Sequence, residues 1–181
     1  MFPVHELSIS SLHISNFDLS RLPDSIGSLP SLVELRVFGN QLIYLPESIG
    51  NLTSLTLLNA GNNQLTRIPD SIGNMSCLRI LYVSNNHLIS IPDSIGNLVS
   101  LIQLDVNHNQ LIHIPASMGN LISLVHLDVN HNQLVHIPDS LCSLTNLTWL
   151  NICDNPITST QACRDAVKRR FGRVGLNLVI E

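Results

Sequence analysis

The sequence predicts an α/β solenoid, a right-handed coil of short repeats with a parallel sheet on its concave side and 3-10 turns or loops on its convex side. Three observations predict it. Aliphatic residues return every 23 positions, they alternate like those of a strand, and a proline and a glycine follow at fixed places. A unit this short cannot bury its apolar face alone, so the units are expected to stack.

The period is set by seven aliphatic residues, each 23 positions after the one before: Ile9, Leu32, Leu55, Leu78, Leu101, Leu124 and Leu147. Six full units occupy 9–146, and a partial seventh begins at Leu147. We therefore expect residues 1–158 to form the solenoid and residues 159–181 to form a C-terminal capping helix and tail.

Each unit should begin with a short strand. In "LIQLDVNHNQLIHIPASMGNLIS" (101–123), Leu101, Leu104 and Val106 have the alternation of a strand with one buried face. An asparagine column follows the strands, and a buried amide there would have to bond backbone groups where the chain turns. Phe17 stands in that place in the first unit, so we expect the column to begin one unit later. Its members are Asn40, Asn63, Asn86, Asn109, Asn132 and Asn155.

The second half of each unit should form one short helical turn. A proline, the first being Pro23 and the last Pro138, ends each inward run because its ring fixes φ. Asp or Ser, as in "DSIG" at 70–73, is expected to cap the turn. A glycine then recurs where a side chain would crowd the next unit, until Cys142 interrupts that column.

The C-terminal segment "STQACRDAVKRRFG" (159–172) predicts a capping helix with Ser159 or Thr160 before it and Gly172 after it. Its expected apolar stripe comprises Ala162, Ala166, Val167 and Phe171. The segment 176–180 is either a final strand or the start of a further part of a larger protein. Five of the nine basic residues lie in this region, and they could form a solvated face or bind an acidic partner or an anionic surface: Arg164, Lys168, Arg169, Arg170 and Arg173.

The repeat pattern L-x-x-L-x-L-x-x-N-x-L-x-x-I-P-x-x-I-G-x-L resembles that of leucine-rich-repeat proteins, over about residues 9–157. Its second half is similar to the 23-residue class found in plant intracellular Ras-group-related repeat proteins, Ras-pathway scaffolds and bacterial effectors. The resemblance implies a protein-interaction module or adaptor, with a pathogen effector acting in a host cell as a narrower form. The alternative is the recognition domain of a larger signalling enzyme or scaffold.

The concave face should carry the function, because solenoids expose an extended binding surface there. Side chains between the inward leucines form rows about 4.8 Å apart. An apolar group and a polar group stand out in these rows, and aromatic residues often anchor protein contacts. The expected partner-binding residues are Arg36, Phe38, Leu57, Ile80, Tyr82, Asp105, His108, His126, Asp128, His131 and Trp149.

The dodecamers "LDVNHNQLIHIP" (104–115) and "LDVNHNQLVHIP" (127–138) raise one chemical alternative. Asp105, Asp128, His108 and His131 are residue types that can hold zinc. However, Asp and His are three residues apart where the strand turns, so they need not converge. We expect a polar contact surface and no metal. Trp149 could instead pack under the C-terminal helix.

Composition narrows the function class. The net charge is −4, which gives no overall basic field for nucleic acid. No nucleophile elbow, phosphate-binding loop or H-E-x-x-H motif is present, so neither an enzyme nor a cofactor is expected. The four cysteines have no paired spacing and indicate reduced thiols, with a Cys153–Cys163 disulfide as the alternative. No signal peptide or membrane span is evident, so we expect a cytoplasmic monomer that binds a protein.

Overall fold

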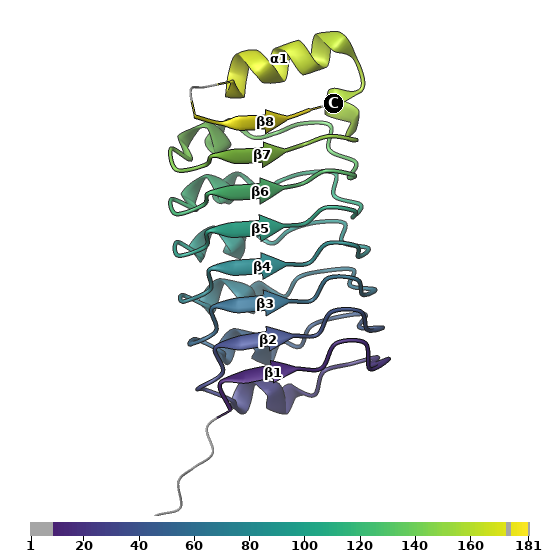
Figure 1. Ribbon diagram of the computed structural model, residues 1–181, viewed down its shortest axis with the longest axis vertical. Coiled ribbons are helices and arrows are strands. Elements are labelled where there is room, and N and C mark those ends of the chain that lie inside the picture. Colours follow the sequence, from purple (N-terminus) through teal and green to yellow (C-terminus); the bar gives the residue numbers. More distant parts are fainter. Residues whose placement is uncertain (1–8, 173–174, 181) are drawn as a thin grey trace, which may run out of the picture.

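The computed structural model describes residues 9–172 and 175–180. Its strands form one parallel sheet in chain order, stacked along the long axis of the molecule with the 3-10 turns behind them (Figure 1). This confirms the predicted solenoid. The strands are β1 (Ser11–His13), β2 (Glu34–Arg36), β3 (Leu57–Asn59), β4 (Ile80–Tyr82), β5 (Gln103–Asp105), β6 (His126–Asp128), β7 (Trp149–Asn151) and β8 (Asn177–Val179).

The strands from β1 to β7 pair so that equivalent residues of successive repeats lie side by side. Ser11 pairs with Glu34, which pairs with Leu57. The middle residue of each strand from β2 to β7 is buried, while its neighbours on both sides are half-buried, apart from Asn151 of β7. Register and alternation therefore point one face of the sheet into the core and leave the other accessible.

The asparagine column is buried and begins at Asn40, as predicted. In the fourth repeat, Asn86 accepts a hydrogen bond at Oδ1 from the backbone N–H of Leu65 at 2.9 Å. Its Nδ2 donates to the carbonyl oxygens of Ala60 at 3.1 Å and Val83 at 3.0 Å. One side chain thus bonds backbone groups of two successive repeats where the chain turns away from the sheet, and the column's asparagines in the preceding and following repeats donate to the same two carbonyls, one to each.

Short 3-10 helices form the opposite layer: η1 (Asp24–Ser28), η2 (Glu47–Asn51), η3 (Asp70–Asn74), η4 (Asp93–Asn97), η5 (Ala116–Asn120), η6 (Asp139–Ser143) and η7 (Pro156–Thr158). The expected Asp or Ser caps are wrong. The proline itself occupies the N-cap position of η1 to η6, and no side chain of that residue caps the helix. Proline lacks the side-chain acceptor that a cap requires.

The glycine column confirms the predicted crowding. A Cβ atom placed on Gly96 would lie 2.5 Å from the backbone oxygen of Ser117 in the next repeat. Gly50 is equally close to Ser71, at 2.3 Å. Neighbouring 3-10 helices can approach this closely because glycine has no side chain.

The C-terminal helix α1 (Gln161–Phe171) covers the last repeat by packing against η7 (Figure 1). Val167 and Phe171 are buried in the shared core, as expected. The predicted stripe is too wide, because Ala162 and Ala166 are exposed. The segment after the helix is a strand: β8 pairs with β7 and extends the sheet. The alternative Cys153–Cys163 disulfide involves the side chain of Cys163, which lies outside the described residues.

None of the helices in the described ranges combines the length and the apolar character needed to cross a membrane.

Candidate protein-binding surface

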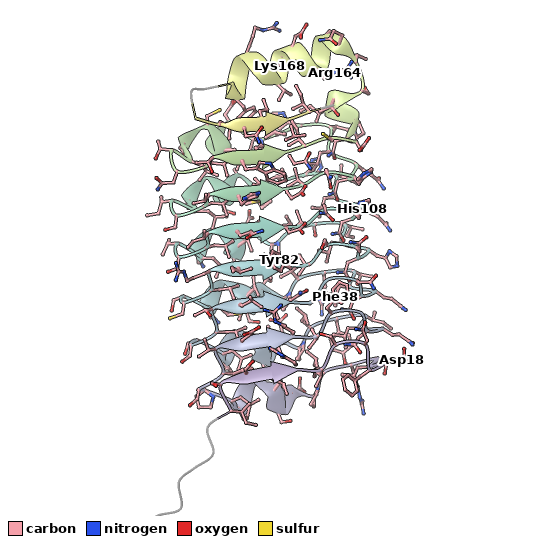
Figure 2. All side chains as sticks on the ribbon, viewed as in Figure 1. Asp18, Phe38, Tyr82, His108, Arg164 and Lys168 are labelled. Atoms are coloured by element: carbon pink, nitrogen blue, oxygen red, sulfur yellow. The ribbon has the colours of Figure 1, made fainter. Side chains whose placement is uncertain are left out.

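We call the accessible side of the sheet, opposite the 3-10 helices, the sheet face. Two rows of side chains cross it, one from the first and one from the third residue of each strand. Tyr82, on β4, lies over the middle of the sheet, whereas His108 and Asp18 lie at the edge where the strands end (Figure 2). The first row is Ser11, Glu34, Leu57, Ile80, Gln103, His126 and Trp149; the second is His13, Arg36, Asn59, Tyr82, Asp105, Asp128 and Asn151.

An apolar groove of about 280 Å³ lies where β2 to β5 begin. Leu57 and Ile80, both expected contact residues, are register partners in it. Val33 and Ile102, which also line the groove, were not among the contact residues predicted from the sequence. They belong to a column one position before the strands, and its 23-residue spacing was a usable signal. The groove is lined by Val33, Glu34, Thr56, Leu57, Arg79, Ile80, Ile102 and Gln103.

A carboxylate pair lies beside this groove. Asp105 and Asp128 are register partners on β5 and β6, and each Oδ1 accepts the backbone N–H two residues later, at 3.1 Å. Burial raises the pKa of the Asp105 carboxyl above its ordinary value of 3.8, although the hydrogen bond from Asn107 acts in the opposite direction. The neighbouring Asp128 charge raises this pKa further.

Arg36 has a partner within the protein. Its Nε donates to Glu34, and His13 Nε2 lies 3.1 Å from the same Glu34 oxygen. The hydrogen bond from Arg36 is the main reason why the pKa of the Glu34 carboxyl lies below its ordinary value of 4.5. The expected contact residue Arg36 is therefore less available to a partner than its place in the second row suggested.

The aromatic residues expected to contact the partner do not form one cluster. Phe38 is 39% exposed beyond the end of β2, and neither Phe38 nor Tyr82 lines the apolar groove. Trp149 is half-buried, and its ring lies 4.2 Å from that of His126, centroid to centroid. Both are in the first row, and α1 packs on η7, so Trp149 belongs to the sheet face.

His108 and His131 stack at the edge of the sheet, with ring centroids 4.1 Å apart, and His131 Nε2 lies 3.1 Å from an Asp154 oxygen. Both have positive φ, 49° and 46°. The same φ recurs at the equivalent places, which hold Asn16, Gly39, Asn62, Asn85 and Asp154. Asn, Asp, His and Gly tolerate this conformation best, so the backbone itself accounts for the residue types in this column.

The metal alternative receives no support from this arrangement. Within the described ranges, no group of three or more His, Cys, Asp or Glu side chains could hold a metal ion. Asp105 and Asp128 lie on the sheet face, whereas His108 and His131 lie at the strand-end edge.

The basic residues of α1 lie at the C-terminal end of the stack, where Figure 2 labels Arg164 and Lys168. Arg164 donates to the Thr158 carbonyl at 2.8 Å and so fastens the helix to η7. Lys168 and Arg169 are exposed. The side chain of Arg170 and all of Arg173 lie outside the described residues.

A parallel sheet on one side, 3-10 turns on the other and one asparagine per repeat define a repeat solenoid. The model of the leucine-rich repeat region matches residues 70–169, and that of a single leucine-rich repeat matches residues 54–75. The chain belongs to the leucine-rich-repeat family. No curated protein matches it.

Solved structures agree. A leucine-rich-repeat protein of Leptospira interrogans is 30% identical over 94% of this chain and 42% of its own, with a TM-score of 0.81. The ectodomain of the Arabidopsis thaliana membrane receptor kinase GASSHO1/SCHENGEN3, solved with CASPARIAN STRIP INTEGRITY FACTOR 2, is 32% identical over 82% of this chain and 18% of its own, with a TM-score of 0.77. The plant peptide hormone receptor RGFR1, solved with RGF2, is 27% identical over 75% of this chain and 26% of its own, with a TM-score of 0.65.

The chain thus spans less than half of the length of each of these proteins. Leucine-rich-repeat solenoids serve in general as protein-binding modules, and members of the family are typically not enzymes.

Proposed function

We propose that this chain is a protein-interaction module of the adaptor type, which binds its partner on the sheet face and performs no chemical step of its own. The observation that carries the proposal is the content of that face: an apolar groove and a carboxylate pair, neither needed by the core, lie on adjoining strands. Accessible apolar surface rimmed by polar groups is typical of interaction sites. Two structural neighbours are receptors solved with their ligands.

The test is quantitative affinity capture from a cell lysate. One bait is the wild type, and a second carries Phe38→Ala, Tyr82→Ala, Asp105→Ala and Asp128→Ala on or beside the sheet face. A matched control carries four substitutions among exposed residues of the 3-10 layer: Asn51→Ala, Asn74→Ala, Asn97→Ala and Asn120→Ala. We expect the control to retain the wild-type partners and the sheet-face variant to lose them. Identical sets of captured proteins for all three baits would refute the proposal.

A second candidate is the recognition part of a larger protein. It is favoured by the share of each structural neighbour that the chain covers, between 18% and 42%. Immunoblotting of the endogenous protein with an antibody against this region tests it. A mass well above 19.9 kDa supports this candidate, and a mass of that size opposes it.

A further inference from the structure

We propose that the partner presents an extended segment in which an aliphatic side chain occupies the groove and a cationic side chain, best an arginine, binds between Asp105 and Asp128. This inference rests on the proposed function and adds the chemistry of the partner. It follows from three features of β3 to β6, namely an excess of hydrogen-bond acceptors, a pair of carboxylates outside any ion pair, and the distance from this pair to the groove.

The acceptors outnumber the donors around the carboxylate pair. Asp105 and Asp128 each use one oxygen for a backbone N–H, the Ser84 hydroxyl also donates to Asp105, and Asn107 Nδ2 lies 3.4 Å from the other Asp128 oxygen. The amide oxygens of Asn107 and Asn130 are buried and accept no hydrogen bond. A buried acceptor without a donor is unfavourable. A guanidinium group offers five N–H donors and no acceptor, so it complements this cluster.

The negative charge of the carboxylate pair is not balanced by an ion pair within the described residues. Arg36, the basic residue of the second row, is paired with Glu34. Tyr82 lies next to Asp105 in the register, and an aromatic face also attracts a cation. A partner cation would therefore meet two carboxylates and a ring, and the positive group of the protein that acts on the Asp105 carboxyl is His108, whose charge lowers the pKa of that carboxyl less than any other contribution changes it.

A metal ion suits this place less well than a guanidinium does. Ca²⁺ takes about six to eight oxygen ligands and Mg²⁺ demands a near-octahedral set. The two carboxylates and two amides are arranged along two neighbouring strands, and no metal-holding group of three acidic, His or Cys side chains occurs in the described ranges. The planar N–H donors of a guanidinium group can reach acceptors on both strands, so they match this arrangement better than a metal ion, which is a single point charge.

The groove fixes where the apolar part of the segment lies. Leu57 and Ile80 form its floor on β3 and β4, and Val33, 41% exposed, flanks them. Gln103 ends the groove on β5, two residues before Asp105. The groove and the acceptor cluster are thus continuous through one strand.

The spacing of the two contacts follows from sheet geometry. The middle of the groove and the middle of the carboxylate pair are two strands apart, about 10 Å, and offset by two residues along the strands, about 7 Å. The diagonal is about 12 Å, and an extended chain advances about 3.3 Å per residue. The aliphatic and cationic residues of the segment are therefore three to four positions apart.

Selection from a random, linear twelve-residue peptide library displayed on mRNA tests the inference. The immobilised targets are the full chain and two variants of equal charge. Asp105→Asn with Asp128→Asn removes the charge of the pair but keeps its shape. Asp70→Asn with Asp93→Asn removes two exposed carboxylates from η3 and η4. A third variant, Leu57→Ser with Ile80→Ser, alters the groove.

We expect wild-type peptides to share an arginine or lysine three or four positions from an aliphatic residue. Their affinity should fall at least tenfold on the Asp105/Asp128 variant and remain unchanged on the Asp70/Asp93 variant. Replacing the peptide arginine by neutral citrulline should cause the same loss on the wild type and no further loss on the Asp105/Asp128 variant.

The outcomes separate this inference from the proposed function. Peptides that depend on Leu57 and Ile80, but lack a basic residue and ignore the Asp105/Asp128 change, would overturn the inference and leave the proposed function standing. Peptides that bind all variants alike, or no enrichment on the wild type, would count against both.

Discussion

Single polar residues hold the repeats together where the chain leaves the sheet. Each asparagine of the column from Asn63 to Asn132 accepts one backbone N–H and donates to carbonyls of two repeats, with distances between 2.9 and 3.1 Å. The sequence predicted this role because a buried amide must find partners, and the partners available at a turn are backbone groups. Asparagine recurs from the second repeat onward because backbone N–H and carbonyl groups need a hydrogen-bond partner at the same turn of each repeat.

Asn86→Ala should lower the free energy of unfolding by about 1–3 kcal/mol, because it leaves the buried N–H of Leu65 without an acceptor and removes one of the two side-chain amide donors at each of the Ala60 and Val83 carbonyls. Urea unfolding followed by circular dichroism measures the change. Gln64→Ala, an exposed residue of the repeat before, is the control and should alter stability by less than about 0.5 kcal/mol. Equal midpoints for the two variants would contradict the role assigned to the column.

Asp105→Asn should raise the melting temperature at pH 7. The raised pKa of this carboxyl means that the folded protein binds its proton more tightly than the unfolded chain, so ionisation lowers stability as the pH rises from 3.8 through the folded value. Asparagine keeps an acceptor for the Asn107 N–H without the charge.

Calorimetry from pH 7 to pH 3 should therefore show the advantage of Asp105→Asn shrinking as the wild-type carboxyl becomes protonated. Asp93→Asn, an exposed residue of η4, controls for the loss of one charge. A lower melting temperature for Asp105→Asn at pH 7 would show that the carboxylate stabilises the fold.

The strands and the 3-10 helices were predictable from the sequence because the residues that form them recur in every repeat. The alternation of aliphatic residues located the strands, and proline followed by glycine located the 3-10 turns. The turn caps were wrong because proline occupies the N-cap position itself. The stripe of α1 was too wide because, of its four expected residues, Val167 and Phe171 are buried in the shared core while Ala162 and Ala166 are exposed. The periodicity of the sequence predicts neither the N-caps of the 3-10 helices nor the buried stripe of α1, because both depend on the three-dimensional contacts between one element and the next.

Gly96→Ala should destabilise the stack by about 1–3 kcal/mol, because its Cβ would lie 2.5 Å from Ser117 oxygen and force η4 and η5 apart. Gly61→Ala is the matched control. It brings the same gain of rigidity in the unfolded chain, but its nearest neighbour atom is 3.3 Å away. Urea unfolding should give the lower midpoint for Gly96→Ala. The reverse order would mean that the convex layer is not tightly packed.

The whole molecule is a one-dimensional assembly in which each repeat contacts its neighbours. The fold could therefore be predicted from the sequence of one repeat and from its recurrence along the chain. The partner-binding surface that we propose could be predicted from the sequence only in part. Register alone placed Leu57 beside Ile80 and Asp105 beside Asp128, but the groove also recruits Val33 and Ile102 from the column before the strands. The shape of a groove depends on three-dimensional packing, which the row pattern does not contain.

Deleting one whole unit, residues 78–100, should leave a folded protein in which β3 pairs with β5 in the same register. The urea m-value should fall by roughly an eighth, in proportion to the chain length removed. Deleting residues 78–89 alone breaks the period and should abolish cooperative unfolding. If the whole-unit deletion failed to fold while the shorter deletion folded, the repeat would not be the structural unit.

Site-specific photo-cross-linking tests the central claim, that the sheet face binds the partner, most directly. A benzophenone amino acid replaces Gln103 on β5 or, in a second protein, Asn97 on η4, and each protein is irradiated with the captured partner or a selected peptide. We expect a covalent adduct through position 103 and none through position 97. An adduct through position 97 alone would place the binding surface on the convex side and contradict it.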